Sequence, residues 1–195
     1  MPVEQVSAVL LAGGMGSRMG GVDKGLVELH GKSLASLAIE RIRPHVEEVV
    51  VTANRNLAAY SGFGCKVVTD DGEGPLCGLR AGLQAASCAF VLTLPCDTPF
   101  FPENLLERLL ARIGNAEIAI AASGGRTHQA FMLARKSLLE DLSAYLDAGG
   151  RKVIEWQERH DIVRVDFPEP AAFFNINTLH DLEKAEVIFS SDERS

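Results

Sequence analysis

The stretch "VSAVLLAGGMGSRMGGVDKG", from Val6 to Gly25, joins an apolar run to a glycine-rich loop. The run "VSAVLLA" (6–12) predicts a buried β-strand, because a short apolar run bounded by turn residues is typical of a strand covered on both faces. Arg18 and Lys24 lie in the loop that follows. Arg18 can bind phosphate oxygens bidentately, Lys24 adds a compact charge, and successive backbone N–H groups can hold an anion. We therefore expect a phosphate-binding loop; the alternative is a flexible surface loop with two solvated cations.

Two well-known phosphate motifs come close to this loop but do not match it. The dinucleotide fingerprint needs a third glycine, and Met19 stands where that glycine should be. The Walker loop fails because one residue too many separates Gly25 from "GKS" (31–33). The loop is therefore expected to be a longer anion-binding concavity of a different kind.

The rest of the chain alternates strand and helix patterns, which predicts a three-layer α/β/α fold with a mostly parallel sheet. Residues 1–195 are expected to form one domain, with a tail at 190–195 that frays. Strands are predicted at 6–12, 47–54, 66–70, 89–97, 116–123 and in "FFNIN" (173–177). Helices are predicted at 33–43, 76–87, 102–113, 136–147 and from Thr178.

Carboxylates follow two of the predicted strands. Asp70 and Asp71 end "KVVTDD", and Asp97 ends "VLTLPCD". Ligands of open parallel sheets bind beyond the carboxyl ends of the strands, so these side chains should share one edge with the glycine loop. Asp97 suits Mg²⁺, which takes one or two carboxylates together with substrate phosphates and water, although an aspartate before Thr98-Pro99 can also be a turn residue. The chain offers no dense His/Cys cluster of the kind that zinc or iron prefers.

Composition limits the classes of partner. The net charge of −7 argues against a nucleic-acid-binding or anionic-membrane surface. No apolar stretch approaches the roughly 18 residues of a membrane span, and "MPVEQ" lacks the basic region of a signal peptide. Four cysteines without metal-ligand spacing are expected to be buried or semi-buried thiols, as in a reducing cytoplasm. We therefore expect a cytoplasmic protein with a small-molecule substrate.

Four segments resemble one known family. "LAGGMGSRMGGVDKGL" (11–26), "GPLCGL" (74–79), "LPCDTPF" (94–100) and "FNINTLHDL" (174–182) are similar to the molybdenum cofactor guanylyltransferases of the MobA type. The resemblance covers nearly the whole chain in the right order. The first segment alone is shared by many nucleotidyltransferases, whereas the combination with the others is considerably more specific.

The resemblance implies a Rossmann-like nucleotidyltransferase fold and a reaction. GMP would be transferred from GTP to the terminal phosphate of molybdopterin, with release of pyrophosphate and formation of the guanine dinucleotide cofactor. Mg²⁺, or Mn²⁺ in its place, would assist. The attacking phosphate is already anionic at neutral pH, so alignment and charge stabilisation are needed more than a general base.

The resemblance also assigns residues to roles. Arg18, Lys24 and Asp97 would carry the chemistry, with Asp97 holding the metal. The GTP site would comprise Leu11, Ala12, Gly13, Gly14, Lys24, Thr52, Asp70, Gly74, Pro75, Gly78 and Asp97. The pterin substrate would face His128, Gln129, Asn175 and Asn177. On residue chemistry alone, a single histidine beside a strand is more often structural, and asparagine at a strand end is commonly a turn or cap residue.

The chain departs from the family pattern at two positions. Thr52 stands where relatives often have asparagine, and Asn54 lies on the same side of the expected strand and could substitute. Leu179 replaces a usual proline, which changes only a rigid first helical turn.

Two other readings stay open from the sequence. A molybdopterin cytidylyltransferase or a sugar-nucleotide enzyme would use the same loop and metal. A non-catalytic nucleotide-binding module is disfavoured, because it could dispense with Asp97. From the family's role we expect a monomer that contacts molybdenum-insertion proteins and molybdoenzyme chaperones.

Overall fold

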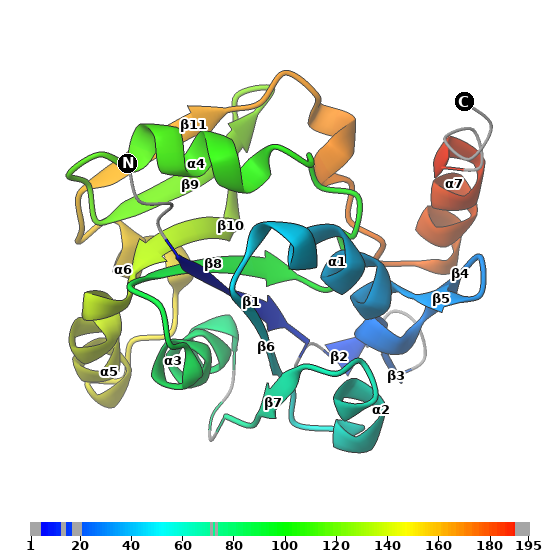
Figure 1. The fold of residues 1–195 in the computed structure, drawn as a ribbon, viewed down its shortest axis with the longest axis horizontal. Coiled ribbons are helices and arrows are strands. Elements are labelled where there is room, and N and C mark those ends of the chain that lie inside the picture. Colours follow the sequence, from blue (N-terminus) through cyan, green and yellow to red (C-terminus); the bar gives the residue numbers. More distant parts are fainter. Residues whose placement is uncertain (1–4, 13–14, 17–20, 71, 73, 190–195) are drawn as a thin grey trace.

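The computed structural model describes residues 5–12, 15–16, 21–70, 72 and 74–189 (Figure 1). The predicted ligand contacts of Gly13, Gly14 and Arg18, the strand-end position of Asp71 and the expected tail at 190–195 lie outside these residues.

A seven-stranded sheet with the order β11-β9-β10-β8-β1-β6-β7 forms the middle layer. Its strands are β1 (Val6–Leu11), β6 (Glu48–Thr52), β7 (Lys66–Val68), β8 (Phe90–Pro95), β9 (Ile118–Ser123), β10 (Arg126–Arg135) and β11 (Ile162–Asp166). All neighbours pair in parallel except β10, which runs antiparallel to both β8 and β9. The predicted α/β class with a mostly parallel sheet is therefore confirmed.

Helices cover both faces of this sheet (Figure 1). Helices α1 (Leu34–Ile42) and α4 (Leu105–Ile113) share one apolar cluster with Ala8 and Leu10 of β1. Helices α3 (Pro75–Ala85), α5 (Leu139–Asp147) and α6 (Val153–Gln157) share the other cluster with Val9. Successive side chains of a strand point to opposite faces, so β1 alone reaches both clusters.

Shorter elements complete the fold. They are the ribbons β2 (Met15–Gly16) with β3 (Val22–Asp23) and β4 (Glu28–Leu29) with β5 (Lys32–Ser33), the helix α2 (Leu57–Ser61), and short 3₁₀ helices at 24–26, 43–45, 136–138 and 170–173. The last helix, α7 (Leu179–Phe189), stands apart from the sheet in Figure 1. It packs through Ala185 on a small cluster that contains Leu29, Leu34 and Ile176.

Two predictions about secondary structure are wrong. Helix α4 begins at Leu105 rather than at 102, because the Leu105 N–H donates to the Pro102 carbonyl in a turn, which leaves Asn104 as the N-cap. The segment 174–177 is not a strand. Its Ile176 N–H donates to the carbonyl of Asp97, at 2.8 Å, instead of joining a ladder.

All four cysteines are free, and three of them are buried, as predicted. Within the described part of the chain, no helix has the length and apolar character needed to cross a membrane.

Gly82 sets how closely α3 approaches β1. A Cβ at this position would lie 2.4 Å from Cγ1 of Val9, a β-branched side chain with little freedom to move. Gly82→Ala should therefore lower the free energy of unfolding by about 1–3 kcal/mol, the usual cost of overpacking. Alanine has a higher helix propensity than glycine, but this raises the free energy of unfolding by only about 1 kcal/mol. Urea unfolding measures whether the free energy of unfolding falls or rises. Gln84→Ala, at an exposed position of the same helix, is the control. A stabilised Gly82→Ala protein would contradict this packing.

Candidate active site

Lys24, Asp97 and Asn177 meet at the carboxyl edge of the sheet. Lys24 Nζ lies 3.4 Å from Asp97 Oδ2 and donates to Asn177 Oδ1 at 2.5 Å. Lys24 belongs to the 3₁₀ helix at 24–26, Asp97 follows β8, and Asn177 precedes α7. The side chains of Lys24 and Asp97 are 18% and 17% exposed, so both remain accessible to a ligand. A cation, a carboxylate and an amide from distant parts of the chain thus face one another.

Hydrogen bonds beyond the ends of the strands hold these loops in place. The Ala12 N–H donates to the Thr52 carbonyl at 2.9 Å, and the Cys96 N–H donates to the Leu11 carbonyl at 3.3 Å. The ladder of β1 therefore continues to the start of the glycine loop on one side and to the residue before Asp97 on the other.

Asp97 and Thr98 also fix the segment that carries the asparagines. The Thr98 hydroxyl donates to Asn175 Oδ1 at 2.8 Å, and it lies 3.3 Å from Asp97 Oδ1. Together with the bond from Ile176 N–H to the Asp97 carbonyl, these contacts join the loop after β8 to the segment before α7.

Asn177 is held from the other side by the first turn of α7. The Asp181 carboxylate accepts from the N–H groups of Asn177 and Thr178, while the Asp181 N–H donates to the Thr178 hydroxyl. This reciprocal arrangement is that of a capping box. The helix begins at Leu179, one residue after the predicted start at Thr178.

The second half of the candidate site lies between β1, β6 and α3. A Cβ on Gly78 would lie 3.1 Å from Thr52 Oγ1, 3.4 Å from Leu11 Cδ2 and 3.7 Å from Asp70 Oδ2. Four of the predicted GTP-site residues therefore come together around a helix position that has no side chain. Gly74 is the N-cap of α3, and its φ of +92° is a conformation that suits glycine. Pro75 is the first residue of the helix, a position at which proline is favoured.

Thr52 and Asn54 make contacts within the protein. Thr52 is 1% exposed, and its hydroxyl lies 3.4 Å from the carbonyl of Leu10. Asn54 Oδ1 accepts from the N–H of Asp70 at 3.0 Å, so this side chain fixes the backbone of a predicted nucleotide contact.

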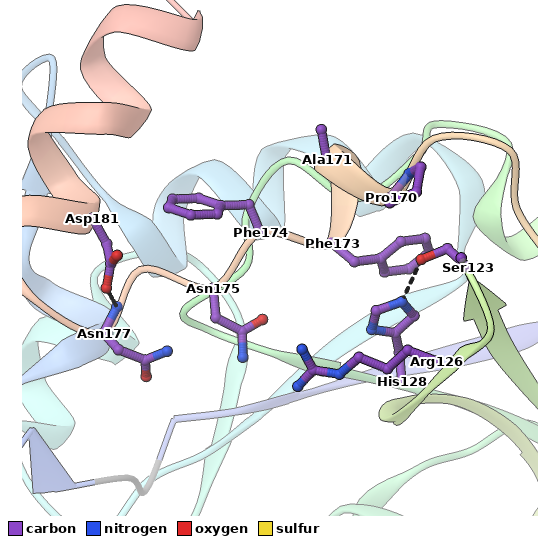
Figure 2. A pocket seen from close by; sticks show the side chains of 11 residues that line it. Ser123, Arg126, His128, Pro170, Ala171, Phe173, Phe174, Asn175, Asn177 and Asp181 are labelled. Carbon is purple, nitrogen blue, oxygen red and sulfur yellow. Dashed lines mark hydrogen bonds between the residues drawn. The ribbon is translucent and has the colours of Figure 1, made fainter.

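A pocket of about 510 Å³ opens beside Asn175 and Asn177 (Figure 2). Its lining includes Arg126 and His128 of β10 and Phe173. The His128 ring stacks on Phe173 with the centroids 4.2 Å apart and the planes 11° apart. Figure 2 shows the side chains of Asn175 and Asn177 on the same side of their segment.

Of the four residues predicted for the pterin, Gln129 alone is not among those that line this pocket. Its carbonyl instead accepts from Gln157 Nε2 at 3.1 Å. The pocket is also lined by three residues that were not predicted from the sequence: Ser123, Arg126 and Phe173. In the segment "RTHQAF", Arg126 stands two residues before His128. Residues two apart on a strand share a face, so the sequence could have placed Arg126 beside His128.

Burial, and secondarily the positive charge of Arg126, lower the pKa of His128. His128 Nε2 lies 2.7 Å from the Ser123 hydroxyl, so the neutral ring has a hydrogen-bond partner. A neutral imidazole beside an aromatic ring and an arginine favours a flat, polar, anionic ligand over a cation.

The donor set at the edge fits one magnesium ion that is also bound by substrate. Among the residues that the structure describes, no group of three or more His, Cys, Asp or Glu side chains converges. Asp97 offers a single carboxylate, whose two contacts with Thr98 and Lys24 are long, at 3.3 and 3.4 Å. Mg²⁺ usually takes such a sparse protein contribution and completes its octahedron with phosphate and water.

Comparison with known proteins agrees with this geometry. Residues 8–162 match the family model described as "MobA-like NTP transferase domain". The chain belongs to the MobA-like nucleotidyltransferase family. It is 43% identical to the molybdenum cofactor guanylyltransferase of Ralstonia nicotianae, over 94% of this chain and 97% of that one. It is 45% identical to the protein of that name from Shewanella pealeana, over 89% of this chain and 90% of that one.

Solved structures show the same architecture. Molybdopterin-guanine dinucleotide biosynthesis protein A from Archaeoglobus fulgidus superposes with a TM-score of 0.79 at 26% identity, covering 95% of this chain and 99% of that one. The 4-diphosphocytidyl-2C-methyl-D-erythritol synthase of Anaerococcus prevotii has a TM-score of 0.80 at 14% identity, covering 96% and 97%. The second likeness concerns the fold alone.

The effect of the Arg126 charge on the pKa of His128 should be measurable. Arg126→Gln should raise the pKa of His128, because one of the two causes that lower it is removed. The native state holds His128 neutral below the ordinary pKa of about 6.5, where the unfolded chain takes up a proton. The His128 contribution to stability therefore falls as the pH drops through that range, and Arg126→Gln should reduce this loss. Nitrogen-detected NMR titration gives the pKa, with the exposed Arg112→Gln as control. An unchanged or lowered pKa in Arg126→Gln would contradict the assigned cause.

Proposed function

We propose that this chain is a molybdenum cofactor guanylyltransferase: it transfers GMP from GTP to the terminal phosphate of molybdopterin. The observation that carries the proposal is the identity of 43–45% to proteins of that name over about nine-tenths of the chain. The meeting of Lys24, Asp97 and Asn177 at the carboxyl edge of the sheet supports it, because phosphoryl-group transfer needs such a set of charged and polar groups.

The reaction balances without a redox partner. An oxygen of the molybdopterin phosphate attacks the α-phosphorus of GTP, and the bond from that phosphorus to the oxygen bridging to the β-phosphorus breaks. Pyrophosphate leaves with the electron pair of this bond. The nucleophile is already anionic, so the residues mainly align two anions and stabilise the charge that develops on the leaving group.

Lys24 is the residue we assign to the triphosphate. Its ammonium lies between the amide oxygen of Asn177, which accepts a hydrogen bond from it, and the more distant carboxylate of Asp97. A phosphate oxygen could take the place of either partner in a charge-assisted hydrogen bond. Leu11, Thr52, Asp70 and Gly78 would shape the nucleoside site next to it, where Gly78 leaves space that a side chain would fill.

Asp97 is the residue we assign to Mg²⁺. A bound Mg²⁺ would neutralise phosphate charge as a Lewis acid, in keeping with the single carboxylate available. Asp97 also holds the backbone of Ile176, so the metal-binding residue and the asparagine segment are positioned together.

The pocket with His128, Phe173 and Arg126 is the site we propose for molybdopterin. Its stacked ring pair offers a flat surface, Arg126 offers a cation for the terminal phosphate, and the two asparagines offer amide groups for a pterin edge. From the role of the family, we propose that this protein contacts molybdenum-insertion proteins and molybdoenzyme chaperones. The four free cysteines are in keeping with a reducing, cytoplasmic compartment, and we propose that the protein is a monomer.

GTP should be the preferred nucleotide. In the presence of Mg²⁺, GTP at about 100 times its Kd should add roughly 2.7 kcal/mol to the stability, a shift of several degrees in the melting temperature. CTP, UTP and ATP should shift it less. The matching assay measures pyrophosphate release in the presence of molybdopterin. Of the four nucleotides, only GTP should support this release. A preference for CTP in both measurements would overturn the guanylyl assignment and keep the transferase.

Lys24→Ala should strongly reduce turnover and spare the fold. We expect kcat to fall by about 10²–10³-fold, the usual cost of removing one group that stabilises transition-state charge. Stability should change by no more than about 1 kcal/mol, because the pair with Asp97 is long and partly exposed. Lys32→Ala is the matched control, since it removes an exposed lysine that pairs with Glu40 away from the site. Normal turnover of a folded Lys24→Ala protein would refute the role of this lysine.

A further inference from the structure

The residue directly before Lys24 is a buried carboxylate with three donors. Asp23 is 7% exposed. Its Oδ1 accepts from the Tyr60 hydroxyl at 2.6 Å and from the Gly25 N–H at 3.2 Å, and its Oδ2 accepts from Asn56 Nδ2 at 3.0 Å. Burying a carboxylate is costly unless it is hydrogen-bonded. All three bonds are made to the carboxylate of the residue directly before Lys24, and one of them comes from the backbone N–H of the residue directly after it.

Tyr60 supports this backbone on both sides of Lys24. Its side chain is fully buried and comes from α2, 37 positions along the chain from Asp23. Burial, followed by the hydrogen bond to Asp23, raises the pKa of Tyr60, so its hydroxyl stays protonated and donates. A Cβ on Gly25 would lie 2.4 Å from the Tyr60 oxygen, so Gly25 packs directly against the same hydroxyl.

Asn56 is the third member of this group and also belongs to the start of α2. It occupies the N-cap position with φ of +52°, yet its side chain makes no capping bond. It donates to Asp23 instead, while its carbonyl accepts from the N–H groups of Ala59 and Tyr60. Helix α2 therefore presents two side-chain donors, Asn56 and Tyr60, to one carboxylate.

We propose that Asp23 is a positioning residue for Lys24, and that Tyr60 and Asn56 act through it. A lysine has four rotatable bonds, so the placement of its ammonium depends on a fixed backbone as well as on its end partners. With both oxygens of Asp23 occupied by neutral donors, this carboxylate is turned toward α2, and the Lys24 ammonium pairs with Asp97 and Asn177. The inference rests on the proposed function and deepens it, because it names what holds the phosphate-binding lysine in register.

The first test removes one hydroxyl and nothing else. Tyr60→Phe should lower kcat/KM for pyrophosphate release from GTP with molybdopterin by about 10–100-fold, since small misplacement of a positioning group has effects of that size. It should also weaken GTP binding measured without molybdopterin. Tyr145→Phe is the matched control. The chain has two tyrosines, and Tyr145, on α5 and away from the site, donates its hydroxyl to the carbonyl of Lys152. Melting temperatures of all variants monitor folding.

A cycle with Lys24→Ala separates positioning from general stabilisation of the fold. If Tyr60 acts through Lys24, adding Tyr60→Phe to Lys24→Ala should change the remaining kcat/KM and the GTP Kd by less than about twofold, because the two effects are then not additive. The same loss in both backgrounds, or a folded Tyr60→Phe protein with wild-type kcat/KM, would overturn the inference.

Asn56→Gly repeats the test if Tyr60→Phe does not fold. Glycine tolerates the positive φ of the exposed Asn56 while removing the donor to Asp23, so the same pattern of losses is expected. A wild-type protein that neither binds GTP nor releases pyrophosphate would refute the proposed function itself. Failure of the positioning role alone would leave wild-type turnover intact.

Discussion

The parallel pairing of β1 with β6 on one side and β8 on the other is the constraint on which the candidate site depends. In this register Leu11 lies opposite both Thr52 and Pro95, so three strands end at nearly the same level. Bonds from Ala12 and Cys96 extend the pairing one step further. The loop to Lys24 and the turn to Asp97 therefore start from adjacent fixed points. Two groups that are 73 positions apart in the sequence meet because of backbone hydrogen bonds, and their own attraction contributes little.

The weakness of the contact between Lys24 and Asp97 suits a site that must exchange partners. At 3.4 Å and partly exposed, the pair can separate at small cost when an anion arrives. A tightly buried pair would be much harder to open, because each charge would then lose its partner in a low-dielectric region. The strongly held carboxylate is Asp23 instead, which binds neutral donors and faces away from the ligand side. A protein with a net charge of −7 can thus still present a partly exposed ammonium group at the proposed phosphate site.

Five strands of the sheet, namely β1, β6, β7, β8 and β9, could be predicted from the sequence because they are short apolar runs with clear ends, and the alternation of strands with helices favours parallel pairing. Asp97, Asn175 and Asn177 could be placed near one edge by the same rule together with the family resemblance. What could not be predicted depends on contacts between distant residues. Helix α2, at Leu57–Ser61, is too short for a periodic pattern, and its importance comes from a hydroxyl that reaches Asp23. The segment 174–177 has strand-like residues, yet its backbone bonds to the turn at Asp97.

Asp97 links the two halves of the proposed reaction through three different groups. Its carboxylate faces Lys24, its carbonyl accepts from Ile176, and the neighbouring Thr98 hydroxyl binds Asn175. The proposed nucleotide side and the proposed pterin side of the site are therefore both connected to one short turn after β8. In a reaction between two anions, most of the barrier that a protein can remove lies in bringing the reacting atoms together in line. A single turn that contacts both proposed walls can serve this alignment, and the segment 174–177 bonds to that turn through Ile176, which a strand paired with sheet neighbours would not do.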